Sequence, residues 1–183
     1  YGGIPQGFMD GYRHIVDFHV DVGWRSQFCA LGEVEYQGIH YYFIDNEYYF
    51  KRDCLYGYDD DAERFAFFSR AVLESLPRIE GFKPDIIHCH DWHTALLPMM
   101  IREHYGEDPF YQGLKTVLTI HNLRHQGIFP LSILGDLLGL TEGSEAANNL
   151  EFNGAVNYFK GGLVYADSIT TVSPTYASEI LTP

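Results

Sequence analysis

The sequence predicts a Rossmann-like α/β domain with a doubly wound, mostly parallel sheet. The first observation is that short apolar runs of strand character alternate with segments whose apolar residues recur at helical spacing. The second is the composition, which is 46% hydrophobic and 16% aromatic over 183 residues and is therefore rich enough for one packed core. The third is that polar residues gather where two of the apolar runs end.

Two strands are predicted near the start of the chain. Between Val16 and Val22, apolar residues alternate with acidic residues and a histidine, which is the period-2 pattern of a half-buried strand. Between Ile39 and Ile44 a second run is rich in aromatic residues and follows the turn-forming pair Gln37-Gly38. We expect these two strands to pair or to lie side by side.

The rest of the chain alternates helix and strand. A helix is predicted after the acidic turn at residues 59–61 and ends at Pro77. Its apolar positions are Phe65, Phe68, Val72 and Leu76. Further strands are predicted at 85–89, 115–121 and 168–172, with helices at 96–101, at 133–138 and after the Ser173-Pro174 pair.

Charge and cysteine content limit the classes of partner. The formal net charge of -13 would repel nucleic acid and anionic membranes, so we expect neither as a partner. No apolar run approaches the roughly 20 residues of a membrane helix, and no signal peptide is evident. Three cysteines without CxxC spacing indicate core thiols in a reducing compartment. These features predict a cytoplasmic protein.

Candidate site residues follow two predicted strands. Ligands of open parallel sheets bind beyond the carboxyl ends of the strands. There the sequence has His90-Asp91-Trp92-His93 and His121-Asn122. Other interpretations remain open: Asp91 could cap the following helix, Trp92 could be a core residue, and His88 is interpreted as a satisfied core histidine.

Several kinds of chemistry find no support in the sequence. There is no HExxH zinc motif, no GxSxG elbow and no GxxxxGK[ST] phosphate loop. Asp91 has no evident carboxylate partner of the kind that a glycosidase needs. We therefore expect no metal and no cofactor. The Gly161-Gly162 pair is interpreted as a site of close helix packing.

Three long segments resemble a known family. They are HCHDWHTALLP, LTIHNLRHQGIF and EFNGAVNYFKGGLVYADSITTVSPTYASEI. An upstream segment also resembles this family, YFIDNEYYFKRDCLYGYDDDAERFAFFSRAVLE. Their sequence is similar to the amino-terminal catalytic domain of bacterial glycogen synthases and plant starch synthases, which belong to glycosyltransferase family 5. The resemblance implies a GT-B enzyme that transfers glucose from ADP-glucose to an α-1,4-glucan with retention of configuration. It also implies ADP-glucose and the glucan as partners.

The resemblance assigns roles to particular residues. His121 matches the histidine near the donor glucose, and Asp91 matches the HDWH aspartate, which we expect to orient groups in the site rather than to act as nucleophile. Tyr56 matches a sugar-binding aromatic position, and Asn153 matches an asparagine near the donor pocket. Asn122, beside His121, is included with the substrate-binding residues.

Two family features have no counterpart in this sequence. The KxGG strand that begins the family's domain is not found, and the carboxyl-terminal nucleotide-binding domain is not found either. We therefore interpret residues 1–183 as a single partial domain that is inactive alone, and that either self-associates through the gap or belongs to a longer chain. The alternatives are a noncatalytic carbohydrate-binding module and another retaining GT-B transferase such as a sucrose synthase.

Overall fold

The computed structural model describes Ile4 and residues 6–182, and it divides into two compact units, Tyr1–Phe82 and Lys83–Pro183. The α/β class with a parallel sheet is confirmed, and the parallel sheet lies in the second unit. The interpretation of residues 1–183 as a single partial domain stays a prediction.

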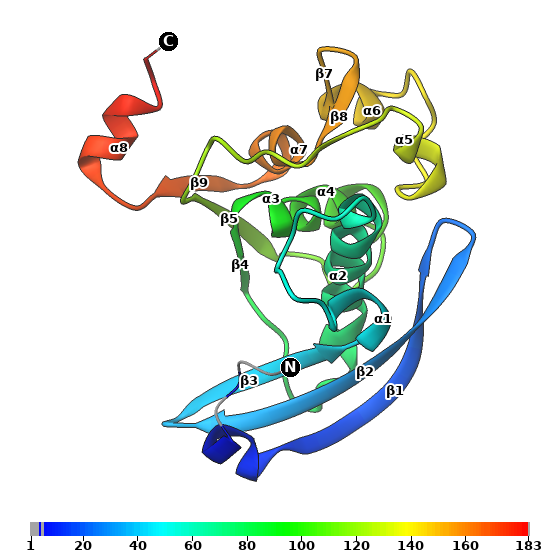
Figure 1. Cartoon of the computed structure of the whole chain (residues 1–183), viewed down its shortest axis with the longest axis vertical. Helices are drawn as coiled ribbons and strands as arrows, with labels where there is room; N and C mark the ends of the chain where they lie inside the picture. The colour runs from blue at the N-terminus through cyan, green and yellow to red at the C-terminus, as the bar shows by residue number, and fades with distance from the viewer. Residues whose placement is uncertain (1–3, 5, 183) are drawn as a thin grey trace. The chain divides into compact units, whose positions relative to one another are not determined.

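The first unit contains a three-stranded antiparallel sheet (Figure 1). Its strands follow the chain order, β1 (Arg13–Val22), β2 (Arg25–Tyr36) and β3 (Ile39–Asp45). Both predicted strands are confirmed, but the expectation that they pair is wrong, because β2 lies between them. The centre of β2 is buried without a break from Cys29 to Val34, so it lacks the alternation that would have identified it.

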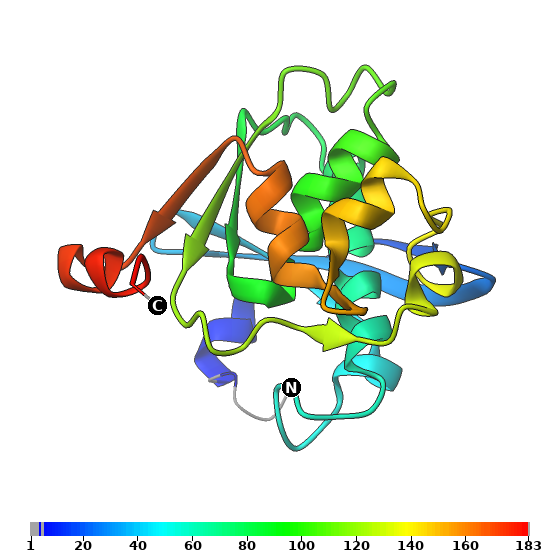
Figure 2. The same ribbon diagram turned by 90° about the horizontal axis from the view of Figure 1, so that it is seen from above.

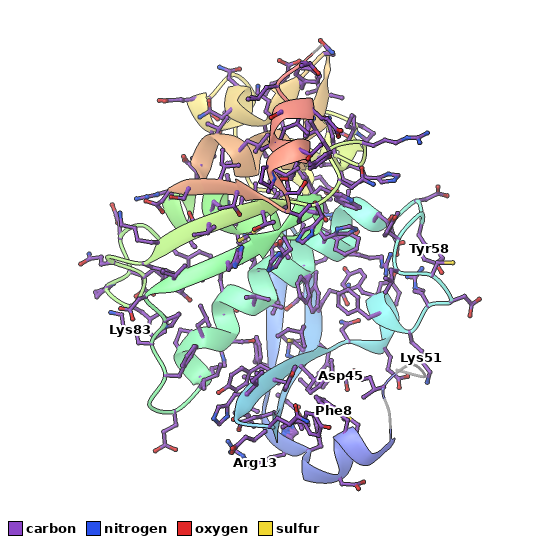
Figure 3. The ribbon with its side chains drawn as sticks, turned by 90° about the vertical axis from the view of Figure 1, so that its left-hand side faces the viewer. Phe8, Arg13, Asp45, Lys51, Tyr58 and Lys83 are labelled. Atoms are coloured by element: carbon purple, nitrogen blue, oxygen red, sulfur yellow. The ribbon has the colours of Figure 1, made fainter. Side chains whose placement is uncertain are left out.

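Helix α2 (Asp61–Ser75) ends just before Pro77, as predicted, and continues into the 3₁₀ turn η2 (Leu76–Arg78). It is preceded by the 3₁₀ turn η1 (Gln6–Gly11), ahead of the sheet, and by the short helix α1 (Glu47–Phe50), after it. Figure 3 labels Lys51 and Tyr58 in the loop between α1 and α2.

A buried arginine holds that loop. Arg64 is 2% exposed, pairs with Asp61, and donates to the backbone oxygens of Tyr49 (2.8 Å) and Leu55 (3.2 Å). The other carboxylate oxygen of Asp61 accepts hydrogen bonds from the backbone N–H groups of Gly57 (2.5 Å) and Tyr58 (3.1 Å). Buried charges are tolerated when they are paired and hydrogen-bonded in this way.

The second unit is built on a parallel sheet with the strand order β4-β5-β9. Its strands are β4 (Ile86–His90), β5 (Lys115–Ile120) and β9 (Ser168–Thr171), each within one residue of a predicted strand. Figure 2 shows α4 (Leu96–Glu103) and α7 (Tyr158–Tyr165) side by side along one face of this sheet.

Helix α7 lies unusually close to its neighbours. A Cβ atom at Gly162 would lie 2.7 Å from the Cβ of Ala95 and 2.9 Å from Leu118 Cδ2, distances that real Cβ atoms do not show. At Gly161 the Leu150 side chain would be 3.0 Å away. Close helix packing, the predicted role of this glycine pair, is therefore confirmed.

The remaining elements of the second unit are short. The helix predicted at 133–138 is α5 (Ile133–Asp136), and α6 (Glu145–Leu150) was not predicted, although Ser144 caps it by accepting a hydrogen bond from the Ala147 N–H (3.2 Å). Helix α8 (Pro174–Glu179) begins at the predicted Ser173-Pro174 pair. A small antiparallel sheet comprises β6 (Ile128–Phe129), β8 (Ala155–Asn157) and β7 (Glu151–Phe152).

Asp167 fastens the amino ends of β5 and β9. Its carboxylate accepts hydrogen bonds from the backbone N–H (2.9 Å) and hydroxyl (3.0 Å) of Thr116, and it pairs with Arg102 and Lys115. Burial raises the pKa of Asp167, but these hydrogen bonds and cations outweigh it and lower the pKa below its usual value. This end of the sheet is thus stabilised by charge pairing.

The cysteines differ in burial. Cys29 and Cys89 are buried, and burial raises the pKa of each thiol to about 12. Cys54 is exposed, so the prediction of three core thiols is wrong for this residue. It lies in the loop that Arg64 holds, where the residues from Asp53 to Gly57 are all exposed. Among the described residues, no helix is both long and apolar enough to cross a membrane.

Candidate active site

The carboxyl ends of β4 and β5 lie side by side, because the parallel register places His90 opposite Thr119. Asp91 begins the short helix α3 (Asp91–Thr94), and His121 follows β5. One carboxylate oxygen of Asp91 accepts hydrogen bonds from the backbone N–H groups of His121 (2.8 Å) and Asn122 (3.2 Å). The two predicted strand ends are therefore joined by a side chain that was predicted for the site.

Asp91 has an uncommon backbone conformation, with a φ angle of 55°. Aspartate visits this left-handed region more readily than most residues, but at an energetic cost that other contacts must offset. The cap of α3 is His90, not Asp91, and Thr94 supports it by accepting from the His90 N–H (2.7 Å) and donating to the His90 oxygen (2.9 Å). The helix-capping interpretation of Asp91 is therefore wrong.

The imidazoles of His90 and His121 also meet. Nδ1 of His90 lies 3.0 Å from Nε2 of His121, within hydrogen-bonding distance, and the ring centroids are 5.2 Å apart. Burial lowers the pKa of His90, and the nearby His88 and His121 lower it further, whereas Asp91 opposes them. His90 is thereby favoured in its neutral form, in which one ring nitrogen donates and the other accepts.

A chain of hydrogen bonds crosses the same face of the parallel sheet. His88 Nε2 lies 2.6 Å from the hydroxyl of Thr119, which lies 2.7 Å from the hydroxyl of Thr170. The ring of His88 also lies against that of His90, with 4.3 Å between centroids. The interpretation of His88 as a satisfied core histidine is wrong in one respect: the residue is satisfied but exposed.

The loop after His121 is shaped by two more contacts. Asn122 Oδ1 accepts a hydrogen bond from the backbone N–H of Arg124 (3.0 Å), the pattern of an Asx turn. The Tyr176 hydroxyl, from α8, accepts from the Leu123 N–H (2.9 Å). Sequence reasoning gave Tyr176 no role. Its position in the first turn after a clear Ser-Pro helix start was the available signal.

Trp92 is 4% exposed and packs against Phe129, with centroids 5.9 Å apart. A Cβ atom at Gly127 would lie 2.4 Å from the indole, and Gly127 has a φ angle of 63°, so a glycine is required there on both counts. The core interpretation of Trp92 is confirmed.

Two predicted residues lie elsewhere. Tyr56 belongs to the first unit, on the loop that Arg64 and Asp61 hold, and is 42% exposed. Asn153 lies in the second unit in the turn between β7 and β8, where it and Gly154 both have positive φ angles of 53° and 78°. Asn-Gly with two positive φ angles is the preferred two-residue hairpin turn. Neither residue takes part in the hydrogen bonds that join the ends of β4 and β5.

His90, Asp91 and His93 are of residue types that can bind zinc. Within the part of the chain that the structure describes, no three His, Cys, Asp or Glu side chains are grouped so that they could hold a metal ion. The hydrogen bonds of Asp91 and His90 instead fix the position of His121.

A parallel sheet with polar residues at the carboxyl ends of its strands places this unit in the α/β class, in which ligands bind at that edge of the sheet. The comparisons with known proteins identify the family. Residues 1–183 match the family described as "Starch synthase catalytic domain", and the chain belongs to it.

Relatives share about half of the sequence. The glycogen synthase of Anoxybacillus flavithermus is 56% identical over 183 residues, which are the whole of this chain and 38% of the relative. That of Geobacillus thermodenitrificans is 55% identical over 182 residues, again the whole chain and 37% of the relative. The chain therefore spans little more than a third of the length of the relatives that it matches.

A solved structure has a similar fold. The catalytic domain of starch synthase IV from Arabidopsis thaliana, bound to ADP and acarbose, aligns with a TM-score of 0.79 and 32% identity. The alignment covers 93% of this chain and 36% of that one.

Proposed function

We propose that the chain forms part of a glycogen or starch synthase that transfers glucose from ADP-glucose to the non-reducing end of an α-1,4-glucan, with retention of configuration. Membership of the starch synthase catalytic domain family supports this proposal, as does the likeness to a protein that binds ADP and acarbose. The observation that carries it is the Asp91 carboxylate, which fixes the backbone of His121 and Asn122 beside the open end of the sheet.

In this proposal His121 contacts the donor glucose and Asp91 positions it. One oxygen of Asp91 already accepts two backbone hydrogen bonds, so the carboxylate is suited to orientation rather than to attack on a sugar carbon. Catalysis would then rest on holding donor and acceptor in register and on stabilising charge in the transition state. Neither contribution requires a nucleophile from this chain.

Asn122, Tyr56 and Asn153 are proposed to bind substrate. The Asx turn leaves the Asn122 amide nitrogen able to donate to a sugar hydroxyl. The half-exposed ring of Tyr56 offers an apolar face and a hydroxyl, the combination that suits a sugar ring. For Asn153 the hairpin turn is a sufficient structural reason, so its role in binding is the least supported of the three.

The experiment uses a hybrid protein, because the chain spans 38% of its relative. The matching segment of the A. flavithermus glycogen synthase is replaced by this chain, and incorporation of labelled glucose from ADP-glucose into glycogen is measured. We expect transfer by the hybrid and none by the 183-residue chain alone. The His121→Ala hybrid is the matched negative control.

The same assay separates the alternatives. A carbohydrate-binding module would bind glycogen but leave the hybrid without transfer. A sucrose synthase would transfer glucose to fructose rather than to glycogen, so fructose is offered as a competing acceptor. We also propose a cytoplasmic location, with neither nucleic acid nor membrane as a partner. This rests on the net charge of -13 and on the lack of an apolar run long enough to cross a membrane.

A further inference from the structure

The side chain of His121 is held at one ring nitrogen. Asp91 fixes its backbone N–H, and Nδ1 of His90 lies 3.0 Å from its Nε2. Its Nδ1 makes no hydrogen bond to any residue that the structure describes. The ring therefore has one nitrogen occupied by the protein and one open to a ligand.

We propose that His90 is a positioning residue for His121: by holding Nε2, it presents Nδ1 of His121 to a sugar hydroxyl. The inference rests on the proposed function and deepens it. When both imidazoles are neutral, a single proton lies between His90 Nδ1 and His121 Nε2. Nδ1 of His121 therefore donates when His90 donates to Nε2, and it accepts when His90 accepts from Nε2. His90 thus governs both the direction and the hydrogen-bonding character of the nitrogen that meets the substrate.

The surroundings of His90 favour this role over simple packing. Its ring packs against that of His88, which is linked by hydrogen bonds through Thr119 to Thr170. Thr119 is only 7% exposed, so this chain of hydrogen bonds is anchored in the sheet. The groups facing His90 are His88 and His121, which disfavour its protonation, and Asp91, which favours it, and burial adds to the first effect.

Nitrogen-15 NMR of the imidazoles in the 183-residue chain tests the geometry without any assay of activity. In the native chain we expect His121 to populate one neutral tautomer. In His90→Phe it should become a mixture of the two, because nothing holds Nε2. Unchanged ring shifts of His121 in His90→Phe would overturn the proposal.

A matched pair of substitutions controls for folding. The amide of asparagine can occupy the position of His90 Nδ1, whereas the longer glutamine places its amide where Nε2 was. His90→Asn should therefore keep the single tautomer of His121, and His90→Gln should lose it. If His90→Phe does not fold, this pair still decides: equal behaviour of the two variants contradicts the proposal.

The hybrid glycogen synthase supplies the functional readout. His90→Phe and His90→Gln should lower kcat between roughly tenfold and a hundredfold, the scale of a misplaced contact, while His90→Asn retains most of the activity. Equal kcat values for Asn and Gln would count against positioning. If the native hybrid makes no glucan at all, the proposed function fails, whereas the tautomer experiment still decides the role of His90.

Discussion

Two aspartates, one in each unit, make the same hydrogen bonds in opposite surroundings. Asp61 accepts from the N–H groups of Gly57 and Tyr58, and Asp91 accepts from those of His121 and Asn122. Each carboxylate therefore fixes two successive peptide groups. Asp61 is 5% exposed and paired with buried Arg64, whereas Asp91 is half-buried and has a positive φ angle of 55°.

From this difference we expect Asp61 to contribute to stability and Asp91 to contribute to activity. Breaking a buried charge pair with satisfied hydrogen bonds strongly lowers the free energy of unfolding, because removing one partner leaves the other as an unpaired charge away from water. A residue with a strained backbone conformation persists only where the surrounding structure holds it, and such residues are common at active sites. Asp61 and Asp91 should therefore fail in different ways when altered, one in stability and the other in activity.

The largest effect is expected for Arg64→Met, which leaves Asp61 buried and unpaired. We expect the free energy of unfolding of the chain to fall by about 3–5 kcal/mol. Asp91→Asn keeps an acceptor oxygen and should cost less than about 1 kcal/mol. Urea unfolding followed by circular dichroism measures both. Equal losses of unfolding free energy in the two variants would contradict the proposed difference between Asp61 and Asp91.

The next effect is on activity. In the hybrid glycogen synthase, His121→Ala and Asp91→Ala should each lower kcat by roughly a hundredfold or more, as expected when a transition-state contact is lost. Asp91→Asn should retain more activity than Asp91→Ala, because the amide oxygen can still accept from the two backbone groups. The melting temperature is the control, and near-native turnover in either alanine variant rejects that residue's role.

A smaller effect separates two interpretations of Asn153. Asn153→Ala should cost about 1 kcal/mol of stability, since alanine avoids the left-handed conformation that the hairpin turn requires, whereas Asn153→Gly should cost little. If the amide also binds the donor sugar, Asn153→Gly raises KM for ADP-glucose in the hybrid. An unchanged KM would leave the turn as the whole explanation.

The sequence allowed prediction of the second unit better than of the first. Parallel strands are short apolar runs, and the rule that ligands lie at their carboxyl ends placed Asp91, His121 and Asn122 together. Strand β2 was missed because its buried centre has no period-2 pattern. The contact between His90 and His121 was not predicted, because the two imidazoles are 31 positions apart in the sequence and such a contact has no local signature.

The contacts that hold the loop between α1 and α2 could not be predicted from local sequence patterns either. Arginine in an amphipathic helix usually lies on the solvent-exposed face. Arg64 is instead buried and donates hydrogen bonds to the backbone oxygens of Tyr49 and Leu55. Those partners are 15 and 9 positions away in sequence. Periodicity reports how a helix faces a core, and it does not report which backbone oxygens a long side chain reaches.

The smallest expected effect is on the pH dependence of the free energy of unfolding, to which His90 and Glu33 of the first unit should contribute in different pH ranges. Burial and the two neighbouring histidines lower the pKa of His90, so the folded chain resists a proton that the unfolded chain binds near the ordinary value of 6.5. The unfolded state then binds more protons, so the free energy of unfolding should fall as pH drops below about 6.5.

Glu33 should act in a lower range. Hydrogen bonds from His40 and then Arg13 lower its pKa, so its stabilisation is present above the ordinary value of 4.5 and is lost as pH falls below it. Urea midpoints measured from pH 7 to pH 4 separate the two: His90→Asn should flatten the slope between about pH 5 and 6.5, and Glu33→Gln should leave that range unchanged. An unaltered slope in His90→Asn would show that His90 titrates alike in the folded and unfolded states, and the described effect of its neighbours on His90 would then be wrong.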